Sequence, residues 1–311
     1  MKKKCLIIDP MHESIFAMLD EAGWDADYQP GITREEIRQK HAGFVGLIVR
    51  SKTTIDRDLL GETPTIKFVA RAGAGLDNLD LDYLEEKKIH VLHAAEGNRD
   101  AVGEFTVGLL LNLLRNISRA DAEVKNSVWE REGNRGEEIM GKTVSLIGYG
   151  NMGQGFARRL SGFGCKILAY DKYKKGFGNA FCSEAEMERV FAETDILSLH
   201  IPLTDETRFM VNLDYLDRFK KNIIVINTAR GEIIPLTDLV LAIEKGKVRG
   251  AALDVLENEK INRLSPQQQQ SFNYLRSKSN VIFTPHIAGW TFESHVKINV
   301  ALVKKIRELD L

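Results

Sequence analysis

Short apolar runs alternate with segments of helical period along most of the chain. In the N-terminal third, the runs that predict strands lie at residues 5–8, 44–49, 66–70 and around Val91, and a helical pattern begins near His12. A second series of predicted strands lies at residues 143–147, 166–170, 196–199, 223–226, 251–253 and 281–283. Apolar runs of this length, separated by helical sequence, are typical of parallel sheets that helices cover on both faces.

The number and spacing of these elements predict two domains. At 311 residues the chain exceeds the usual size of a single domain. A long helix leaves the first domain near Asp100, and the helical pattern at residues 291–311 returns to it. We therefore expect an α/β fold with two doubly wound parallel-sheet domains, one formed by residues 1–98 with 288–311 and the other by residues 99–287. The polar insertion at residues 261–280 is expected to be either a short surface helix or a loop.

Composition and charge exclude several classes of protein. The formal net charge is -1, so the chain as a whole does not attract nucleic acid or an anionic membrane. Its three cysteines form no Cys-x-x-Cys motif, which fits a reduced, cytoplasmic setting. The apolar stretch after the basic start ends at Asp9, too early for a signal peptide, and the longest apolar segment, residues 105–114, is too short to cross a bilayer. We expect a cytoplasmic protein.

A glycine-rich turn follows the strand predicted at residues 143–147. It reads Gly148-Tyr-Gly150-Asn151-Met152-Gly153 and leads into a helical segment. In dinucleotide-binding domains the first glycine of such a turn permits the tight bend, the second lets the backbone approach a pyrophosphate, and the third lets the helix pack closely on the strand. The free N–H groups at the start of the helix then bind the phosphates. These residues are therefore candidate cofactor ligands.

The strand predicted at residues 166–170 ends at Asp171. In dinucleotide-binding domains a carboxylate about twenty residues after the glycine turn binds the adenosine ribose hydroxyls, and its charge would repel the 2′-phosphate of NADP. The sequence therefore favours NAD. Lys172 and Lys174 lie close by and moderate this preference.

Three later strands of the same domain end in groups suited to hydride-transfer chemistry. Arg230 follows one strand, Asp254 and Glu259 follow the next, and His286 follows the last. A guanidinium group binds a carboxylate through two parallel bonds, an imidazole transfers protons near neutral pH, and a neighbouring carboxylate fixes the orientation of that imidazole. Taken singly, each residue also fits a structural role. Because they end consecutive strands, we expect Arg230, Glu259 and His286 to form a catalytic site without a metal.

The sequence resembles the D-2-hydroxyacid dehydrogenase family over nearly its whole length. The matching segments are residues 47–53 (LIVRSKT), 71–80 (RAGAGLDNLD), 141–153 (GKTVSLIGYGNMG), 200–204 (HIPLT), 227–231 (NTARG) and 284–286 (TPH). This resemblance implies a flavodoxin-like substrate-binding domain split around a Rossmann NAD-binding domain.

The resemblance also implies roles for individual residues. Arg230, Glu259 and His286 match the family's catalytic arginine, glutamate and histidine. The imidazole would take the proton from the C2 hydroxyl as hydride leaves for the nicotinamide, and the guanidinium would hold the substrate carboxylate and carbonyl oxygen. Asp254 matches an acid near the nicotinamide carboxamide. Other positions expected to line the cofactor are His200, Pro202, Thr228, Ala229 and Gly289.

The first domain carries the residues expected to hold the rest of the substrate. Ala74 and Gly75 match a loop whose backbone N–H groups bind the substrate carboxylate. Arg50, Lys52 and Arg71 follow two successive predicted strands, and cations there could bind a phosphate at the far end of the substrate, as in the D-3-phosphoglycerate dehydrogenases that these segments resemble. The alternative for these residues, above all for Lys52, is a solvated basic rim.

The resemblance implies NAD-dependent oxidation of D-3-phosphoglycerate to 3-phosphohydroxypyruvate, the reaction that opens serine biosynthesis. Two alternatives stay open: a hydroxypyruvate or glyoxylate reductase, which needs no phosphate site, and an NAD(H)-sensing, corepressor-like scaffold. The chain ends soon after the closing helical segment, so we expect no regulatory domain. The helix after Asp100 and the charged arm that follows resemble the family's dimerisation region, with Trp129 as a candidate anchor, and a homodimer is expected.

Overall fold

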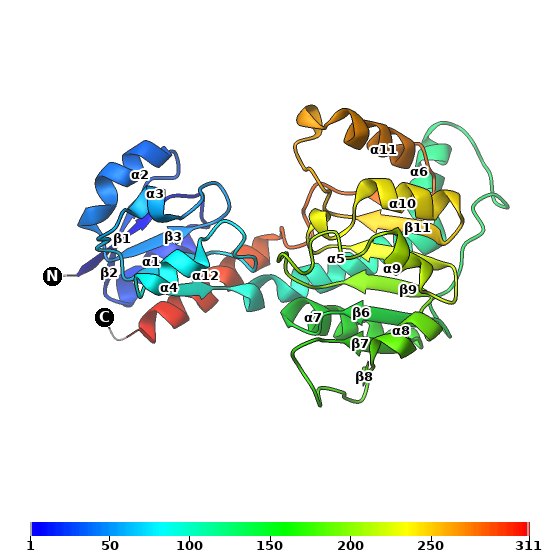
Figure 1. Cartoon of the computed structure of the whole chain (residues 1–311), viewed down its shortest axis with the longest axis horizontal. Coiled ribbons are helices and arrows are strands. Elements are labelled where there is room, and N and C mark those ends of the chain that lie inside the picture. Colours follow the sequence, from blue (N-terminus) through cyan, green and yellow to red (C-terminus); the bar gives the residue numbers. More distant parts are fainter. Residues whose placement is uncertain (1, 310) are drawn as a thin grey trace. The chain divides into compact units, whose positions relative to one another are not determined.

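The computed structural model describes residues 2–309 and 311 and divides the chain into two compact units (Figure 1). Unit 1 comprises the chain up to Arg99 together with Trp290–Leu311, and unit 2 comprises Asp100–Gly289. The boundaries expected from the sequence, after residues 98 and 287, lie one and two residues from these positions.

Unit 1 is built on a five-stranded parallel sheet in the order β2-β1-β3-β4-β5. The strands are β1 (Lys3–Ile7), β2 (Trp24–Tyr28), β3 (Gly46–Val49), β4 (Phe68–Arg71) and β5 (His90–His93). This order is that of flavodoxin-like sheets, as expected. Strand β2 was not expected: its apolar residues alternate with Asp25 and Asp27, a pattern that only the edge of a sheet accommodates.

Helices cover both faces of this sheet because alternate side chains of each strand point to opposite sides. Ile7 packs with α1 (Ser14–Glu21) and α12 (Phe292–Arg307), whereas Leu6 packs with the helices of the other face. These are α2 (Arg34–Lys40), α3 (Arg57–Leu60) and α4 (Leu81–Glu86). The C-terminal helix α12 therefore completes the core of unit 1, as its pattern predicted.

Unit 2 is built on a seven-stranded parallel sheet in the order β12-β11-β10-β9-β6-β7-β8. The strands are β6 (Thr143–Ile147), β7 (Lys166–Tyr170), β8 (Ser183–Glu184), β9 (Ile196–Leu199), β10 (Ile223–Asn227), β11 (Val248–Leu253) and β12 (Val281–Phe283). Counted from β6, the order is that of the Rossmann sheet with a seventh strand added. The two-residue strand β8 was not expected, because it is too short to leave a periodic pattern.

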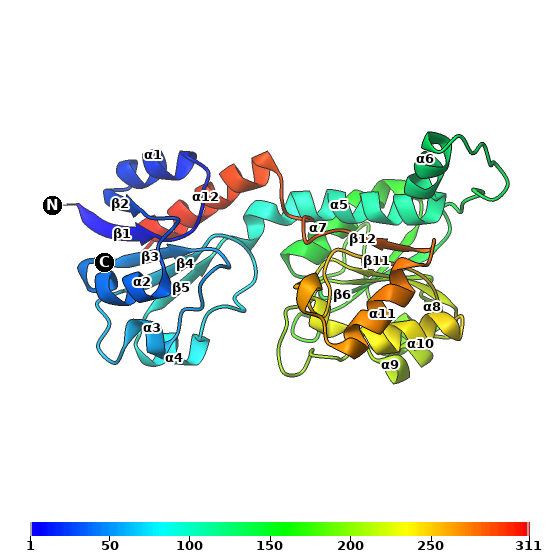
Figure 2. The same ribbon diagram turned by 90° about the horizontal axis from the view of Figure 1, so that it is seen from above.

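Two helical layers enclose the seven-stranded sheet, as Figure 2 shows. One layer contains α5 (Ala95–Arg115) and α7 (Asn151–Leu160). The other contains α8 (Met187–Glu193), α9 (Leu213–Asp217), α10 (Leu236–Glu244) and α11 (Pro266–Arg276). Along β10, Val225 packs into the second layer while Ile224 and Ile226 pack into the first.

One helix differs from the sequence-based expectation, and another confirms it. Helix α5 begins at Ala95, five residues before the expected start, because Gly97 is part of it: a Cβ at Gly97 would lie 2.6 Å from the backbone of Ile298, so glycine is needed there for packing. The polar insertion at residues 261–280 was expected to be a short surface helix or a loop. It contains the helix α11, so the first alternative is confirmed. Its N-terminus carries a capping box formed by Ser265 and Gln268.

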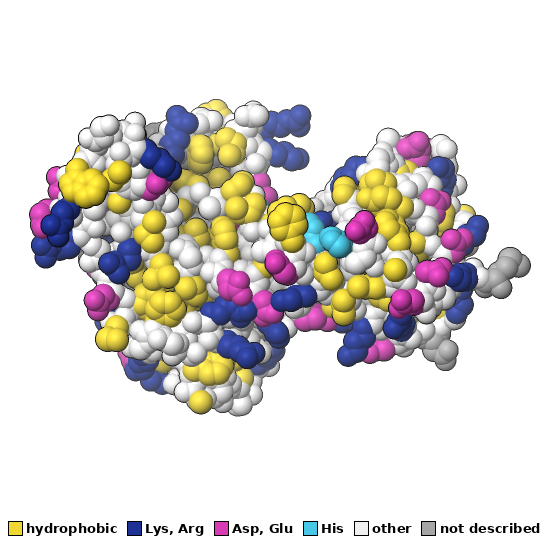
Figure 3. Space-filling model, turned by 180° about the vertical axis from the view of Figure 1, so that it is seen from behind, with side chains coloured by type: hydrophobic (Ala, Val, Ile, Leu, Met, Phe, Trp, Pro, Cys, Tyr) yellow, Lys and Arg dark blue, Asp and Glu magenta, His cyan; other side chains and the backbone are white. Residues whose placement is uncertain are grey.

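The surface is mixed in charge. Figure 3 shows acidic and basic side chains interspersed over the visible face of each unit. Over the described part of the chain, none of the helices is sufficiently long and apolar to span a membrane. The exposed apolar side chains include a group on α6 (Ile117–Lys125) and the arm after it: Ile117, Val124, Val128, Trp129 and Met140.

Candidate active site

The glycine turn joins β6 to α7, and its three glycines meet different constraints. Gly148 has a φ of 94°, and a Cβ there would lie 2.4 Å from the carbonyl oxygen of His200. A Cβ on Gly153 would lie 2.2 Å from the carbonyl oxygen of Gly148. A Cβ on Gly150 would meet no protein atom within 4 Å. The fold therefore requires Gly148 and Gly153, whereas the open space at Gly150, at the N-terminus of α7, fits an approaching pyrophosphate.

Gly150 is the N-cap of α7, and Asn151 and Met152 form the first turn of that helix. No acidic residue lies in this first turn. The helix terminus therefore presents its positive end and its free backbone N–H groups without a competing carboxylate on the same turn, which suits an anionic ligand.

The carboxylate of Asp171 is held by the backbone at the end of β7. Its Oδ2 accepts a hydrogen bond from the N–H of Tyr149 (2.9 Å), and its Oδ1 accepts from the N–H groups of Tyr173 and Lys174 (3.0 Å each). Oδ2, which accepts only one of these bonds, has a further lone pair for a ribose hydroxyl. The carboxylate therefore joins the glycine turn to the loop after β7.

The two lysines next to Asp171 are engaged elsewhere. Lys172 forms an ion pair with Glu206, whose hydrogen bond raises the pKa of the lysine. The Nζ of Lys174 donates to the carbonyl oxygen of Tyr149 at 3.2 Å. Both ammonium groups therefore have protein partners, and the preference for NAD over NADP stays a prediction.

His200 follows β9 and lies against the glycine turn. Its Nε2 is 2.9 Å from the Oγ of Ser198, and its ring packs on Phe156 with the centroids 5.4 Å apart. Burial lowers the pKa of His200 to about 3. The imidazole is therefore neutral at physiological pH, which fits a wall of the cofactor site. Pro202, in the same segment, accepts a hydrogen bond from Thr207 at its carbonyl oxygen (2.7 Å).

The segment after β10 is shaped by the buried side chain of Asn227. Its Oδ1 accepts from the N–H of Ala229 (3.0 Å), and its Nδ2 donates to the carbonyl oxygen of Arg230 (2.9 Å). The Oγ1 of Thr228 lies 3.3 Å from that of Thr106 on α5. Asn227 belongs to the NTARG segment, but the sequence did not indicate that it folds the loop carrying Arg230.

Asp254 organises the turn that carries His286. The carboxylate is 1% exposed and accepts hydrogen bonds from the hydroxyl of Thr284 and the N–H groups of Ile287 (2.9 Å) and Ala288 (2.8 Å). The backbone N–H of His286 donates to the carbonyl oxygen of Asp254 (2.7 Å). Asp254 was expected next to the nicotinamide, and that role stays a prediction; these contacts show that it shapes the turn.

His286 itself has a φ of 56°, a left-handed conformation that costs free energy for a residue other than glycine. Such a conformation persists only where the surroundings impose it. The hydrogen bonds to Asp254 from His286 and the two residues after it supply that constraint.

The structure brings Glu259 and His286 together. The Oε1 of Glu259 lies 2.8 Å from the Nδ1 of His286, with the two side chains 50% and 45% exposed. A carboxylate on Nδ1 leaves Nε2 available to exchange a proton with a substrate. Arg230 lies at the end of β10, which pairs with β11, and the glycine after it touches the loop that leads to Glu259. Gly289 follows this turn and ends unit 2.

Unit 1 places Arg50 in a contact that the sequence did not predict. Its guanidinium carbon lies 4.7 Å from the centroid of the Trp290 ring, and its Nη2 is 3.2 Å from the Nε2 of His295. Burial lowers the pKa of His295, and the charges of Arg50 and His12 lower it further, so a neutral imidazole faces the guanidinium. No spacing in the sequence connects Arg50 with residues 240 or more positions later, which explains why its contacts with Trp290 and His295 were not predicted.

The other residues expected to bind substrate lie on neighbouring loops of unit 1. The Nζ of Lys52 donates to the carbonyl oxygens of Pro30 (3.3 Å) and Ile32 (3.0 Å). Arg71 ends β4, and its side chain folds back over Gly73, where a Cβ would lie 1.5 Å from Nη1. Ala74 and Gly75 follow in the irregular turn after β4. None of these contacts brings Arg50 and Lys52 together.

Comparisons with known proteins agree with this architecture. Residues 107–288 match the family model for the NAD-binding domain of the D-isomer specific 2-hydroxyacid dehydrogenases. The chain is 35% identical to a D-3-phosphoglycerate dehydrogenase of Methanocaldococcus jannaschii over 309 residues, which are 98% of this chain and 57% of that enzyme. It is 38% identical to a hydroxypyruvate reductase of Thermotoga maritima over 266 residues, 85% of each chain.

A solved structure shows the same fold. The D-lactate dehydrogenase of Aquifex aeolicus, complexed with NAD and lactic acid, has a TM-score of 0.81 and 27% identity, covering 98% of this chain and 94% of that one. The family model covers more than half of the chain, and the Thermotoga relative is matched over most of its length. This chain belongs to the family of D-isomer specific 2-hydroxyacid dehydrogenases.

Proposed function

We propose that this chain is an NAD-dependent dehydrogenase of D-2-hydroxy acids and that its substrate is D-3-phosphoglycerate, oxidised to 3-phosphohydroxypyruvate. The observation that carries the proposal is the 2.8 Å contact between Glu259 and His286 at the carboxyl ends of β11 and β12, in the unit that also holds the glycine turn. The chain spans only 57% of the length of the Methanocaldococcus phosphoglycerate dehydrogenase, so the substrate of that enzyme is carried over to this chain as a proposal.

The residues of unit 2 fit a nicotinamide dinucleotide. The space at Gly150 and the N-terminus of α7 would take the diphosphate, and Asp171 would take the ribose hydroxyls. When bound, NAD supplies the acceptor for the hydride that leaves C2 of the substrate.

The chain's own groups handle the proton and the charge. In the proposed mechanism, Nε2 of His286 accepts the proton of the C2 hydroxyl while the C2–H bond breaks toward the nicotinamide, which leaves a keto acid and an imidazolium. Glu259 stabilises that imidazolium through Nδ1 and fixes the ring. Arg230 binds the substrate carboxylate and the developing carbonyl oxygen. In reduction the same proton returns from Nε2.

The choice of substrate depends on Arg50. Burial lowers the pKa of this guanidinium, and Trp290 and His295 hold it in place, so it is a partly desolvated cation at the end of β3. Such a cation binds a phosphate more strongly than a fully hydrated one. The Thermotoga relative favours the alternative, a hydroxypyruvate reductase, for which no phosphate site is needed.

Steady-state kinetics distinguishes these two enzymes. We expect kcat/KM for D-3-phosphoglycerate to fall roughly 10- to 100-fold in Arg50→Ala, a range that corresponds to about 1.5–3 kcal/mol for a charged hydrogen bond, with a much smaller loss on D-glycerate. Arg38→Ala is the control, because Arg38 pairs with Glu35 and Asp58 on the exposed surface of α2. Equal losses on both substrates would favour the reductase. Protein that binds NADH but turns over no hydroxy or keto acid would favour the scaffold.

We also propose that the chain forms a homodimer through α6 and the arm that follows it. Trp129 is 81% exposed there, and Val124 and Val128 are half exposed beside it. An exposed indole next to other apolar side chains is typical of a protein interface.

A further inference from the structure

The contact between Glu259 and His286 requires that both side chains be held in place. Both side chains are about half exposed, and exposed ion pairs seldom hold a fixed geometry by themselves. His286 is fixed by the hydrogen bonds of its turn to Asp254. Glu259 lies on a loop between β11 and α11, and this loop must also be held in place. A carboxylate that changed position would orient the imidazole only part of the time.

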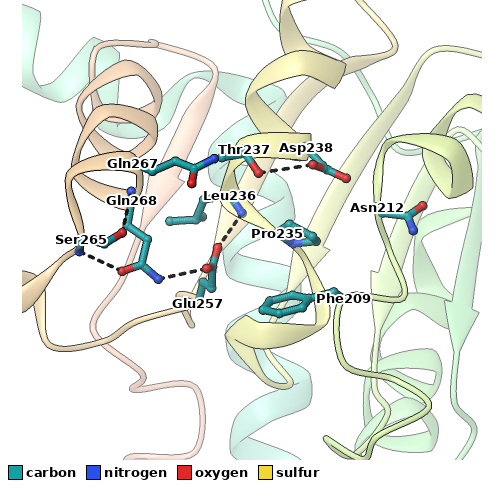
Figure 4. Close-up of a pocket in the computed structure, with 10 residues that line it drawn as sticks. All are labelled: Phe209, Asn212, Pro235, Leu236, Thr237, Asp238, Glu257, Ser265, Gln267 and Gln268. Carbon is teal, nitrogen blue, oxygen red and sulfur yellow. Dashed lines mark hydrogen bonds between the residues drawn. The ribbon is translucent and has the colours of Figure 1, made fainter.

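The loop before Glu259 is tied to two helices by one carboxylate. Glu257 accepts at Oε2 from the backbone N–H of Leu236, in the first turn of α10 (2.9 Å), and at Oε1 from the Nε2 of Gln268, in the first turn of α11 (2.9 Å). Figure 4 shows both bonds, with Glu257 between the two helices. A carboxylate at the N-terminus of α10 is also favoured by the helix dipole.

Gln268 extends this connection into the loop on the other side of Glu259. Its Oε1 accepts from the backbone N–H of Ser265 (3.1 Å) and from the Nδ2 of Asn258 (3.4 Å). Asn258 also donates to the carbonyl oxygen of Arg263 (3.2 Å) and accepts from the N–H of Lys260 (3.0 Å). The residues on both sides of Glu259 are therefore linked to one another and to Gln268.

On its other side, the loop that carries Glu259 packs against the backbone of the loop after β10. A Cβ on Gly231 would lie 1.9 Å from the carbonyl carbon and oxygen of Leu256, so the loop that carries Arg230 touches the segment just before Glu257. The loop of Glu259 is thus held between the β10 loop on one side and the Glu257–Gln268 bond on the other.

On the basis of the proposed function, we propose that Glu257 and Gln268 form a clamp that positions Glu259 against His286. Glu257 and Gln268 are positioning residues, since neither touches the imidazole in the contacts above. The inserted helix α11 thereby supports the active site from outside it. The side chain of Gln268 caps α11 and also binds the loop that bears the catalytic carboxylate.

The setting of the clamp makes it testable without unfolding the protein. Glu257 and Gln268 line a cavity of about 400 Å³ together with polar residues such as Asn212, Thr237 and Asp238 (Figure 4). Truncating Gln268 therefore enlarges a polar, open cavity and creates no apolar void in the core.

The test compares Gln268→Ala with Gln270→Ala, an exposed glutamine of the same helix. We expect kcat to fall roughly three- to tenfold in Gln268→Ala, as for the loss of one hydrogen bond of ordinary net strength, with KM for NAD unchanged. In the reducing direction the imidazolium donates the proton, and Glu259 favours that charged form. The pH at which kcat falls to half should therefore move to lower values, in the same direction as in Glu259→Gln but by less.

A double substitution supplies the rescue. Glu257→Gln combined with Gln268→Glu reverses the polarity of the bond: the new amide at 257 donates to the new carboxylate at 268 and keeps an oxygen for the N–H of Leu236. The carboxylate at 268 still accepts from Ser265 and Asn258. We expect the double variant to recover most of the kcat and the pH profile that either single substitution loses.

Hydrogen–deuterium exchange gives a readout that does not depend on turnover. Peptides covering residues 256–264 should exchange faster in Gln268→Ala than in Gln270→Ala. If kcat and the pH profile of Gln268→Ala match those of Gln270→Ala while Glu259→Gln alters both, the clamp is wrong and the proposed function stands. If the wild-type protein has no turnover, the proposed function fails, and equal exchange in the two alanine variants would then overturn the clamp as well.

Discussion

The glycine turn after β6 and the His286 turn after β12 lie at the same edge of one sheet, yet their shapes have different origins. Gly148 takes its φ of 94° with no side chain to oppose it, and the close contact of Gly153 is with Gly148, five residues away. His286 takes a φ of 56° against the preference of its side chain, and its constraint comes from Asp254, 32 positions earlier. The shape of the first turn is favoured by its own glycines, with His200 as a distant contact, whereas the shape of the second turn depends on the finished fold.

The largest effect should come from the residue at the centre of the second turn. His286→Gln removes the group that exchanges the substrate proton, so kcat should fall by about 10²–10⁴-fold, the usual contribution of general acid–base catalysis. His90→Gln is the matched control, because its imidazole is exposed on β5 of unit 1. Steady-state rates in both directions measure the difference. Similar losses in the two variants would contradict the assignment of His286.

The next effect concerns the stability of unit 2 as a function of pH. The pKa of His200 is lowered by burial to about 3 in the folded state, so the unfolded chain binds a proton there first as the pH falls. Between about pH 6.5 and about pH 3 this group alone should reduce the free energy of unfolding by about 1.4 kcal/mol per pH unit. Denaturant unfolding of the wild type and of His200→Gln, at a series of pH values, checks this. Parallel curves for the two proteins would show that the ring accepts its proton while folded.

Two substitutions in the glycine turn should separate folding from binding. Gly153→Ala places a Cβ 2.2 Å from the carbonyl oxygen of Gly148, and the overlap should cost about 1–3 kcal/mol of stability. Gly150→Ala meets open space, so its unfolding temperature should match the wild type while its affinity for NAD falls. Thermal unfolding and titration with NADH give the two quantities. An unchanged affinity in a folded Gly150→Ala protein would place the diphosphate elsewhere.

The smallest effect on either turn should come from the surface. Trp129→Glu puts a charge on the arm after α6, where 81% of the indole is exposed, and should halve the mass measured by light scattering at micromolar concentration. The exposed indole touches neither turn in the contacts described above, so kcat and NADH affinity should stay within about twofold of the wild type. A wild-type protein that is already monomeric would remove the dimer from the proposal.

Several parts of the site could be predicted from the sequence because their constraints are local. Each of these signals lies within a few consecutive residues: the glycine turn, Asp171 at the end of its strand, and the apolar runs of β6, β7, β9 and β12. The α/β class and the two doubly wound sheets followed from the same pattern. Strand β2 and the start of α5 were misjudged, because an edge strand tolerates acids and a helix tolerates glycine when tertiary packing favours them.

The sequence by itself determined which strands end in reactive groups, since parallel strands bring their carboxyl ends to one edge whatever their spacing along the chain. Only the tertiary structure decided that Glu259 meets His286, that Asp254 holds the turn carrying His286, and that Trp290 and His295 contact Arg50. These contacts join residues 27 to 245 positions apart. No local pattern encodes such pairs, because their partners come together only when the sheets and helices have packed.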